Sequence, residues 1–281
     1  MSKKEILQKA KKKKEIILGE INKKGFLKTI TDNLKNRKIL PYQSNTEILR
    51  VDIVSYCNLS CYNCNRTIGG APSSEFMDLG QIKKFVRESL NHKKHWKMIV
   101  LVGGEPTLHP QLFEIVKEIK KYKDWNPQCK IRIDSNGHGE KVEGILKQLP
   151  PWLEIRNSKK ISNKQRHRSY NLAPIDFKKY QKARFSKGCR VTEKCGIGLN
   201  PRGFYPCGPG GAVDRVFGFD IGIKNLNEVT EKRVRRQRKT LCRYCGLYKE
   251  AKDNPRKQEN SPSWEKAFRE YKKKKPKTRK Y

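Results

Sequence analysis

Apolar and polar positions in the middle of the chain follow two rhythms. Short apolar runs bounded by turn residues predict β-strands; these runs are Leu49–Val54, Lys97–Val102, Lys130–Asp134 and Leu153–Ile155. Between them, apolar residues recur every three or four positions, which predicts helices; these stretches are Asp78–Asn91, Pro110–Lys121 and Lys141–Leu149. Strands that alternate with helices indicate βαβ units and a parallel sheet, as in a doubly wound sheet or a barrel, with functional sites at the carboxyl ends of the strands.

The flanking regions have other patterns. Residues 1–46 show loose helical spacing interrupted by Lys11–Lys14, and predict a basic helical extension. A core then covers 47–187, and 188–250 forms a smaller unit with a hairpin at Gly196–Cys207 and a basic helix at Glu231–Lys239. Residues 251–281 have the composition of a basic tail.

Composition narrows the class of protein. The 281 residues carry 65 Lys and Arg against 28 Asp and Glu, a net charge of +37, with 35% hydrophobic residues and a mean hydropathy of −0.89. The strand-like runs argue against full disorder, and no apolar stretch approaches the roughly 20 residues of a membrane helix. No secretory signal follows Met1, so the nine cysteines are expected to be reduced thiols in the cytoplasm. The charge is compatible with a solvated surface, an anionic partner or nucleic-acid binding.

Three cysteines follow the first predicted strand at a spacing suited to metal. Cys57, Cys61 and Cys64 form a C-x3-C-x2-C pattern, with no fourth Cys or His nearby. Structural zinc sites use four ligands, so zinc would need a distant one. Three thiolates can instead hold three irons of a [4Fe–4S] cluster and leave the fourth iron open to an external ligand.

Two further motifs follow the next two strands, and the three segments together resemble the radical S-adenosylmethionine (radical SAM) enzymes. Val102–Thr107 contains Gly103, Gly104, Glu105 and Pro106, like the GGEP motif of that family, and Asp134–Gly137 contains Ser135 and Asn136, like its Thr-Asn-Gly turn. The resemblance covers residues 47–157 and implies that these residues bind SAM beside the cluster. The family signature is C-x3-C-x-aromatic-C, whereas this chain has Asn63 at the aromatic position. The implied fold is α/β, a partial (β/α)6 TIM-type barrel.

The later cysteines are Cys189, Cys195, Cys207, Cys242 and Cys245. Together with the hairpin they resemble the SPASM/twitch extension of radical SAM enzymes, which carries auxiliary [4Fe–4S] clusters. Five cysteines imply one such cluster, and Cys189, Cys207, Cys242 and Cys245 fit the twitch arrangement best, with Cys195 spare or replacing Cys189. A zinc ribbon is the alternative. Cys129 is expected to be an ordinary thiol.

The resemblance implies reductive cleavage of SAM to a 5′-deoxyadenosyl radical, which abstracts hydrogen from a peptide or small polar substrate, in a net oxidation or modification assisted by the auxiliary cluster. The electron donor would be a flavodoxin or ferredoxin, and the basic surface suggests an anionic substrate. The polar residues after the fourth strand are candidates for substrate contact without an assigned base; they are Arg156, His167, Tyr170, Asn171 and Asp176. The alternative is a non-catalytic iron–sulfur or zinc protein that binds nucleic acid, although no RNA-binding motif is present.

Overall fold

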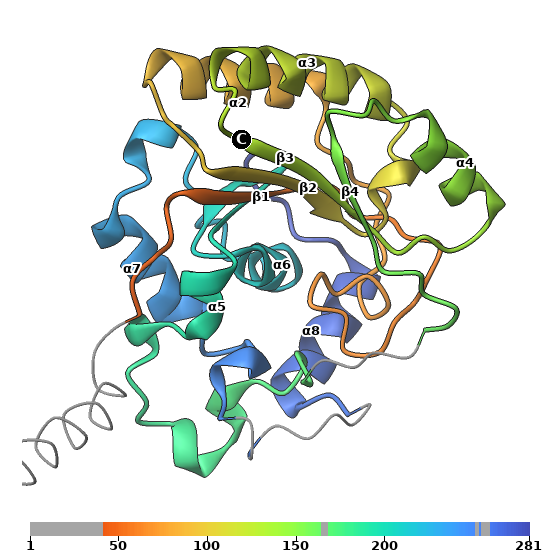
Figure 1. Cartoon of the computed structure of the whole chain (residues 1–281). Coiled ribbons are helices and arrows are strands. Elements are labelled where there is room, and N and C mark those ends of the chain that lie inside the picture. Colours follow the sequence, from red (N-terminus) through yellow and green to blue (C-terminus); the bar gives the residue numbers. More distant parts are fainter. Residues whose placement is uncertain (1–41, 164–167, 251–252, 254–258) are drawn as a thin grey trace, which may run out of the picture. The chain divides into compact units, whose positions relative to one another are not determined.

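The computed structural model describes residues 42–163, 168–250, 253 and 259–281 (Figure 1). The predicted extension over residues 1–46 and the candidate His167 therefore lie almost wholly outside the described residues. The strands are β1 Ile48–Val54, β2 Met98–Gly103, β3 Lys130–Ser135, β4 Glu154–Asn157, β5 Ile197–Asn200 and β6 Gly203–Tyr205. The α-helices are α2 Leu79–Asn91, α3 Leu112–Trp125, α4 Glu140–Gln148, α5 Arg190–Lys194, α6 Gly208–Phe217, α7 Glu231–Leu241 and α8 Pro262–Lys273. Short 3-10 turns at Pro106–Leu108, Pro174–Asp176, Lys178–Tyr180, Phe185–Lys187, Leu226–Glu228 and Gly246–Tyr248 connect them.

The six strands form one open sheet in the order β4-β3-β2-β1-β5-β6. Neighbouring strands from β4 to β5 are parallel, and only β6 runs antiparallel to its neighbour. The predicted strands and helices of the βα region are all present, so the α/β prediction with a mostly parallel sheet is confirmed. The βα repeat supplies β1 to β4, however, and the hairpin supplies the remaining two strands.

The hairpin is therefore part of the main sheet. β5 lies beside β1, with Leu49 opposite Ile197 and Val51 opposite Leu199. Residues Tyr42–Tyr281 group into a single compact unit. The boundary expected near residue 188 lies inside this unit, and the strand that follows it pairs with β1.

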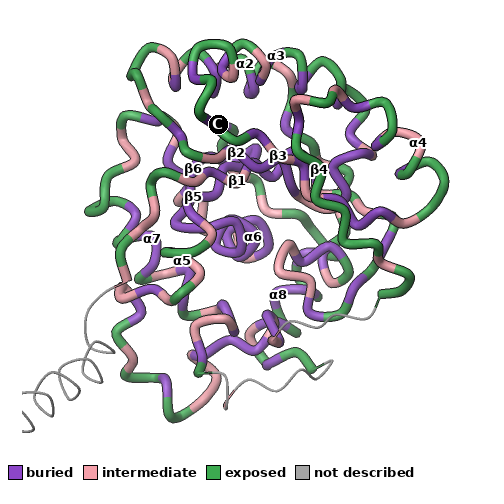
Figure 2. Tube along the Cα trace, in the orientation of Figure 1, coloured by how far each residue is buried: buried purple, intermediate pink, exposed green. Residues whose placement is uncertain are grey.

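The two faces of the sheet have opposite chemistry. Alternate residues of β1 (Leu49, Val51 and Ile53) have no exposed surface and pack in a core with α2, α3 and α4, which cover this face (Figures 1 and 2). Arg50 and Asp52 point to the other face, since successive side chains of a strand alternate. The helix α6 lies on that second side and is buried along nearly its whole length. The sheet thus has an apolar outer face and a charged inner face.

The described C-terminal residues are folded, although their composition is typical of a tail. The helix α8 buries Trp264 and Phe268 in a second apolar core shared with α6. At the chain end, Tyr281 is buried, and its hydroxyl donates to Glu88 of α2 at 2.8 Å. Residues 259–281, within the segment expected to be a basic tail, thus include a packed helix, because one apolar stripe on a highly charged helix is enough to dock it. In the described part of the chain, every helix is too short or too polar to span a bilayer.

Candidate active site

The loop that leaves β1 carries the first three cysteines. Cys61 is buried, whereas Cys57 and Cys64 are half-buried. Asn63 is buried and has a φ of +53°. This left-handed backbone disfavours bulky residues and is tolerated by Asn. The local conformation thus explains Asn63 at the aromatic position of the signature, while the neighbouring Tyr62 is exposed.

The paired glycines after β2 lie directly against this loop. A Cβ atom at Gly103 would lie 2.3 Å from the carbonyl oxygen of Val54, and one at Gly104 would lie 1.9 Å from that of Tyr56. The Gly104 N–H donates to the Val54 carbonyl at 2.8 Å, and the Glu105 N–H donates to the Tyr56 carbonyl at 2.8 Å. The resemblance implies that these glycines contact SAM. The structure shows that they admit the backbone preceding Cys57, because any side chain here would push the two loops apart.

Glu105 joins the second motif to the third. Its carboxylate has no exposed surface. The Oε1 atom accepts from the Thr107 and Ser135 hydroxyls, both at 2.8 Å, and Oε2 accepts from the Asn136 N–H at 2.7 Å. Since both oxygens are engaged with protein donors, the Glu105 side chain organises the site.

Asn136 joins the third motif to the first. Its side-chain amide donates to Asn58 Oδ1 at 2.8 Å and lies 3.5 Å from the Cys57 sulfur. The Leu59 N–H also donates to that sulfur, at 3.4 Å. Burial raises the pKa of Cys57 to about 11, against the lowering effect of these donors, and the charges of Glu105 and Cys64 add to the rise. The three motifs thus meet at the carboxyl ends of β1, β2 and β3.

Two residues of the segment after β4 complete this site and were missed from sequence. The Lys160 ammonium lies 3.4 Å from the Cys61 sulfur, and Asn163 Oδ1 accepts from the Ser60 N–H at 2.7 Å. A polar, basic stretch offers no pattern that singles these residues out. A cation and several N–H donors beside three thiols suit a thiolate-bound centre, because they stabilise negative charge on sulfur. Over the described ranges, no group of three or more His, Cys, Asp or Glu side chains converges closely enough to hold a single metal ion.

The inner face of the sheet carries a cluster of arginines around one carboxylate. Asp134 lies 3.2 Å from Arg50, 2.7 Å from Arg132 and 3.9 Å from Arg156, measured between side-chain nitrogen and oxygen. Arg156, a candidate from the sequence, has a side chain that is 64% exposed. Arg50 and Arg132 were missed, although a charged residue at every second position of a parallel strand was a readable signal.

Four of the five later cysteines line one small cavity. They are Cys189, Cys207, Cys242 and Cys245, with apolar neighbours that include Leu241 and Leu247. Burial raises the pKa of Cys207 to about 12, and the charges of Cys189 and Cys195 contribute. Burial followed by the charges of the neighbouring thiols also raises the pKa of Cys242 and Cys245 well above the usual range. Four mutually interacting thiols around one enclosed space fit the ligand chemistry of an iron–sulfur cluster.

Two further thiols, Cys195 and Cys129, do not line this cavity. Cys195 ends α5 and is not part of the cavity lining; its carbonyl oxygen accepts from Arg50 Nε at 3.2 Å. Cys129 is buried in the core on the outer face of the sheet, beside α3. Cys129 thus lies apart from the four cavity thiols, whereas Cys195 lies outside the cavity lining but near enough for its charge to raise the pKa of Cys189 and Cys207.

The other described candidates for substrate contact make contacts within the protein. Tyr170 is fully buried, and its hydroxyl donates to the Pro209 carbonyl at 2.6 Å. Asp176 accepts from the Ser263 hydroxyl and N–H at 2.6 and 3.0 Å, at the start of α8. Asn171 accepts from the Ser261 N–H through its carbonyl oxygen at 2.9 Å. These three residues therefore anchor the region around α6 and α8.

Comparison with known proteins points in one direction. Residues 51–155 match the model of the Radical SAM superfamily. A probable GTP 3′,8-cyclase of Pyrococcus horikoshii is 35% identical over 74 residues, which are 26% of this chain and 23% of that protein. One from Methanococcus aeolicus is 35% identical over 96 residues, 33% of this chain and 31% of that protein. The matched part thus spans about a quarter to a third of these curated relatives.

The similarity of this chain to solved structures is weaker. BtrN in complex with AdoMet and 2-DOIA is 14% identical with a TM-score of 0.42, and the alignment covers 72% of this chain and 89% of that one. SuiB of Streptococcus suis bound to S-adenosylmethionine is 17% identical with a TM-score of 0.29, over 40% of this chain and 23% of that one. The family match covers the strands and loops that bring the three motifs together, and residues 51–155 of this chain are accordingly a radical SAM domain.

Proposed function

We propose that Cys57, Cys61 and Cys64 hold a [4Fe–4S] cluster whose fourth iron is free for SAM, and that the chain is a SAM-cleaving enzyme. One observation carries this proposal. The cysteine loop, the glycine pair and the Asn136 turn are tied together at one edge of the sheet by Glu105 and Asn136. When bound, the cluster and SAM supply the 5′-deoxyadenosyl radical that abstracts hydrogen from the substrate.

The chain's own residues have distinct tasks in this site. Asn136 orients the Cys57 sulfur, and Lys160 places a positive charge beside Cys61. The backbone of Gly104 and Glu105 is fixed against the cysteine loop, which sets where a ligand at this edge meets main-chain groups. Such preorganisation matters because a reactive radical must be held against its target with competing groups excluded.

The four cavity thiols support an auxiliary [4Fe–4S] cluster held by Cys189, Cys207, Cys242 and Cys245. Four thiolates would bind all four irons and leave none for a substrate. Such a cluster would be suited to accept one electron from a substrate that loses a hydrogen atom to the radical and then a proton, which would make the overall reaction a net two-electron oxidation of the substrate. A flavodoxin or ferredoxin would reduce the SAM-site cluster.

The arginines on the inner face of the sheet favour a polar, anionic substrate. Arg156 has an exposed side chain at the rim, and Arg50 and Arg132 share Asp134 with it. Guanidinium groups bind carboxylate or phosphate groups in a bidentate manner. The proposed substrate is a small polar molecule or peptide that carries such a group.

The decisive experiment is SAM cleavage by the full chain, reconstituted with iron and sulfide without oxygen and reduced with dithionite. We expect 5′-deoxyadenosine and methionine as products, and no 5′-deoxyadenosine after replacement of Cys57, Cys61 and Cys64 by Ala. Cys129→Ala is the matched control, since that thiol lies in the apolar core, and it should retain cleavage. Absence of 5′-deoxyadenosine from well-reconstituted protein would refute the enzymatic proposal.

A further inference from the structure

Arg66 lies between the two sets of thiols. It follows Cys64 by two residues, and its side chain is only 13% exposed. Its Nε atom donates to Asp52 Oδ1 of β1 at 2.8 Å. Breaking an ion pair that is shielded from water leaves a buried charge without a partner, which costs free energy. The pairing with Asp52 therefore fixes the position of the Arg66 guanidinium.

The far end of the Arg66 side chain reaches the second set of thiols. A Cβ atom at Gly208 would lie 2.4 Å from the nearest terminal nitrogen of Arg66, so the guanidinium rests on the backbone directly after Cys207. Burial by itself lowers the pKa of Arg66, but the Asp52 carboxylate and the charges of Cys64 and Cys207 raise it above the usual value. Arg66 in turn lowers the pKa of Cys207, against the dominant effect of burial. One permanent cation therefore acts on one thiol from each set.

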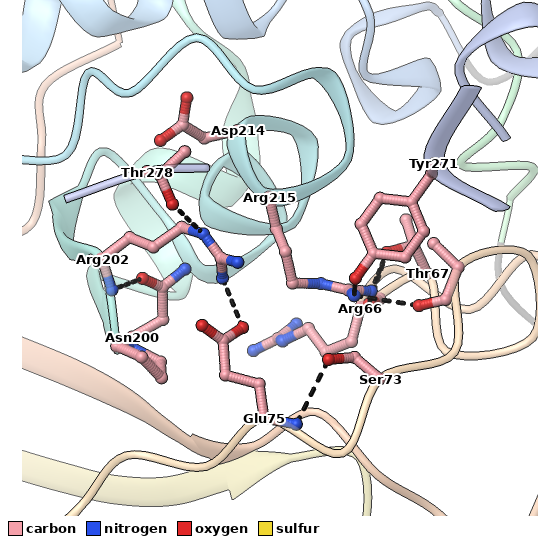
Figure 3. Close-up of polar contacts among 12 residues, drawn as sticks. Arg66, Thr67, Ser73, Glu75, Asn200, Arg202, Asp214, Arg215, Tyr271 and Thr278 are labelled. Carbon is pink, nitrogen blue, oxygen red and sulfur yellow. Dashed lines mark hydrogen bonds and ion pairs between the residues drawn. The ribbon is translucent and has the colours of Figure 1, made fainter. Parts of the chain in front are cut away.

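The turn that holds Arg66 is itself fixed by α6, the helix that begins after Cys207. The guanidinium of Arg215 on α6 donates to the Arg66 carbonyl at 3.1 Å and to the Thr67 hydroxyl at 2.7 Å. It also donates to the hydroxyl of Tyr271 on α8 at 2.8 Å (Figure 3). Because Cys207 directly precedes the helix that carries Arg215, the position of Arg66 relative to Cys207 is set by the fold.

We propose that Arg66 is a positioning residue that raises the reduction potentials of both iron–sulfur clusters. The inference rests on the proposed function, because it requires the clusters at both thiol sets. Reduction adds negative charge to a cluster, and a nearby buried cation stabilises the reduced form, since charges interact strongly where water is excluded. Asp52 lies on the sheet side of Arg66 and partly offsets this field.

The test is a potentiometric titration of the reconstituted full chain, followed by EPR, for the native protein and three variants. Arg66→Met should shift both midpoint potentials to more negative values, and Arg66→Lys should leave them close to those of the native protein. Asp52→Asn should shift both to more positive values, because it removes the offsetting anion. Arg202→Met is the matched control, since Arg202 is similarly buried and its side chain pairs with Glu75 at 2.5 Å (Figure 3); neither potential should move.

The outcomes separate this inference from the proposed function. If the native protein shows no cluster, the proposed function is wrong; if it shows only one, the auxiliary cluster is excluded and this inference is overturned, while SAM cleavage is judged by its own assay. If both clusters are present but Arg66→Met moves one potential or neither, the inference is overturned. It is also overturned if Arg66→Met and Asp52→Asn shift the potentials in the same direction, which would indicate a general structural disturbance. If Arg66→Met fails to retain its clusters, Asp52→Asn decides: a positive shift of both potentials supports the inference, and any other result contradicts it.

Discussion

Glu105 accepts hydrogen bonds with both carboxylate oxygens in a position without exposed surface. A buried carboxylate is tolerated only where donors replace the lost water. Here the donors come from two loops, so the charge of one residue holds the glycine motif and the Asn136 turn in register. At the residue scale, polar contacts of this kind and the paired glycines together shape the site.

Glu105→Gln should therefore destabilise the protein. The variant places an amide where the carboxylate accepted from Thr107, Ser135 and Asn136, so at least one buried donor loses its acceptor. The expected loss is about 2–3 kcal/mol of unfolding free energy. Urea denaturation of the metal-free protein measures it, with the exposed Glu143→Gln as control, which should change stability by about 0.5 kcal/mol or less. Equal effects of both substitutions would contradict the role of Glu105.

His109 supplies a pH-dependent contribution to stability. It is buried; its Nε2 atom lies 3.0 Å from the Met77 carbonyl, and its Nδ1 accepts from the Gln111 N–H at 3.0 Å. This pattern is that of a neutral imidazole that donates through Nε2. Burial lowers the pKa of His109 below the ordinary value, against the raising effect of the Met77 carbonyl.

The sign of the effect follows from linkage. A histidine whose pKa is lower in the folded state keeps its full contribution above the unfolded value of about 6.5, and loses it as the pH falls towards the folded value. His109→Gln should therefore flatten the decline in unfolding free energy on acidification below about pH 6.5. The exposed His92→Gln is the control and should preserve the native slope in urea titrations at several pH values. An unchanged slope for His109→Gln would disprove the assignment.

At the scale of elements, α8 shows how a charged sequence can still dock. Its buried residues are Trp264, Ala267, Phe268 and Tyr271, which form one stripe along the helix. A Cβ atom at Gly70 would lie 2.3 Å from the ring of Phe268. The helix thus packs on the segment that follows Cys64, and it supports the loop of the candidate cluster site from the outside.

Phe268→Ala should consequently affect both stability and cluster loading. Removal of a buried ring costs about 3–5 kcal/mol, and the loop after Cys64 loses its packing partner. We expect a lower thermal midpoint and fewer irons per chain after reconstitution than in the native protein. Lys266→Ala on the exposed side of the same helix should leave both quantities unchanged within error. Native iron content in Phe268→Ala would show that the loop does not depend on α8.

At the scale of the whole molecule, one sheet and one helix connect the two sets of thiols. The loop after β1 carries Cys57 to Cys64, β5 lies beside β1, and α6 starts after Cys207 at the end of the hairpin. The net charge of +37 does not identify the function at this scale. The charges that affect the thiols are those of a few buried arginines, since buried charges act strongly on their neighbours whereas exposed charges are screened by salt.

Iron content tests this two-site arrangement. The native chain should bind about eight irons, as expected for two [4Fe–4S] clusters, and Cys242→Ser with Cys245→Ser should bind about four. The remaining cluster should keep the EPR signal of the SAM site, including its change on addition of SAM. Cys195→Ser is the matched control and should keep about eight irons, because Cys195 is not part of the cavity lining. A loss of four irons in Cys195→Ser would move the ligand assignment to that residue.

The sequence by itself determined the parts of this protein whose signals are local. Periodicity in Leu49–Val54 and in the helical stretches predicted the sheet and the helices that cover it, because alternation and helical spacing are set by neighbours a few residues apart. The cysteine spacing and the paired glycines identified the candidate site for the same reason.

Only the tertiary structure decided how distant segments meet. It placed the hairpin beside β1, docked α8 on the loop after Cys64, and brought Lys160 to Cys61 and Arg66 to Cys207. These contacts join residues that lie far apart along the chain, and burial of a lone arginine or lysine leaves no periodic mark in a basic sequence. Their energies depend on which surfaces exclude water together, and that is a property of the folded chain alone.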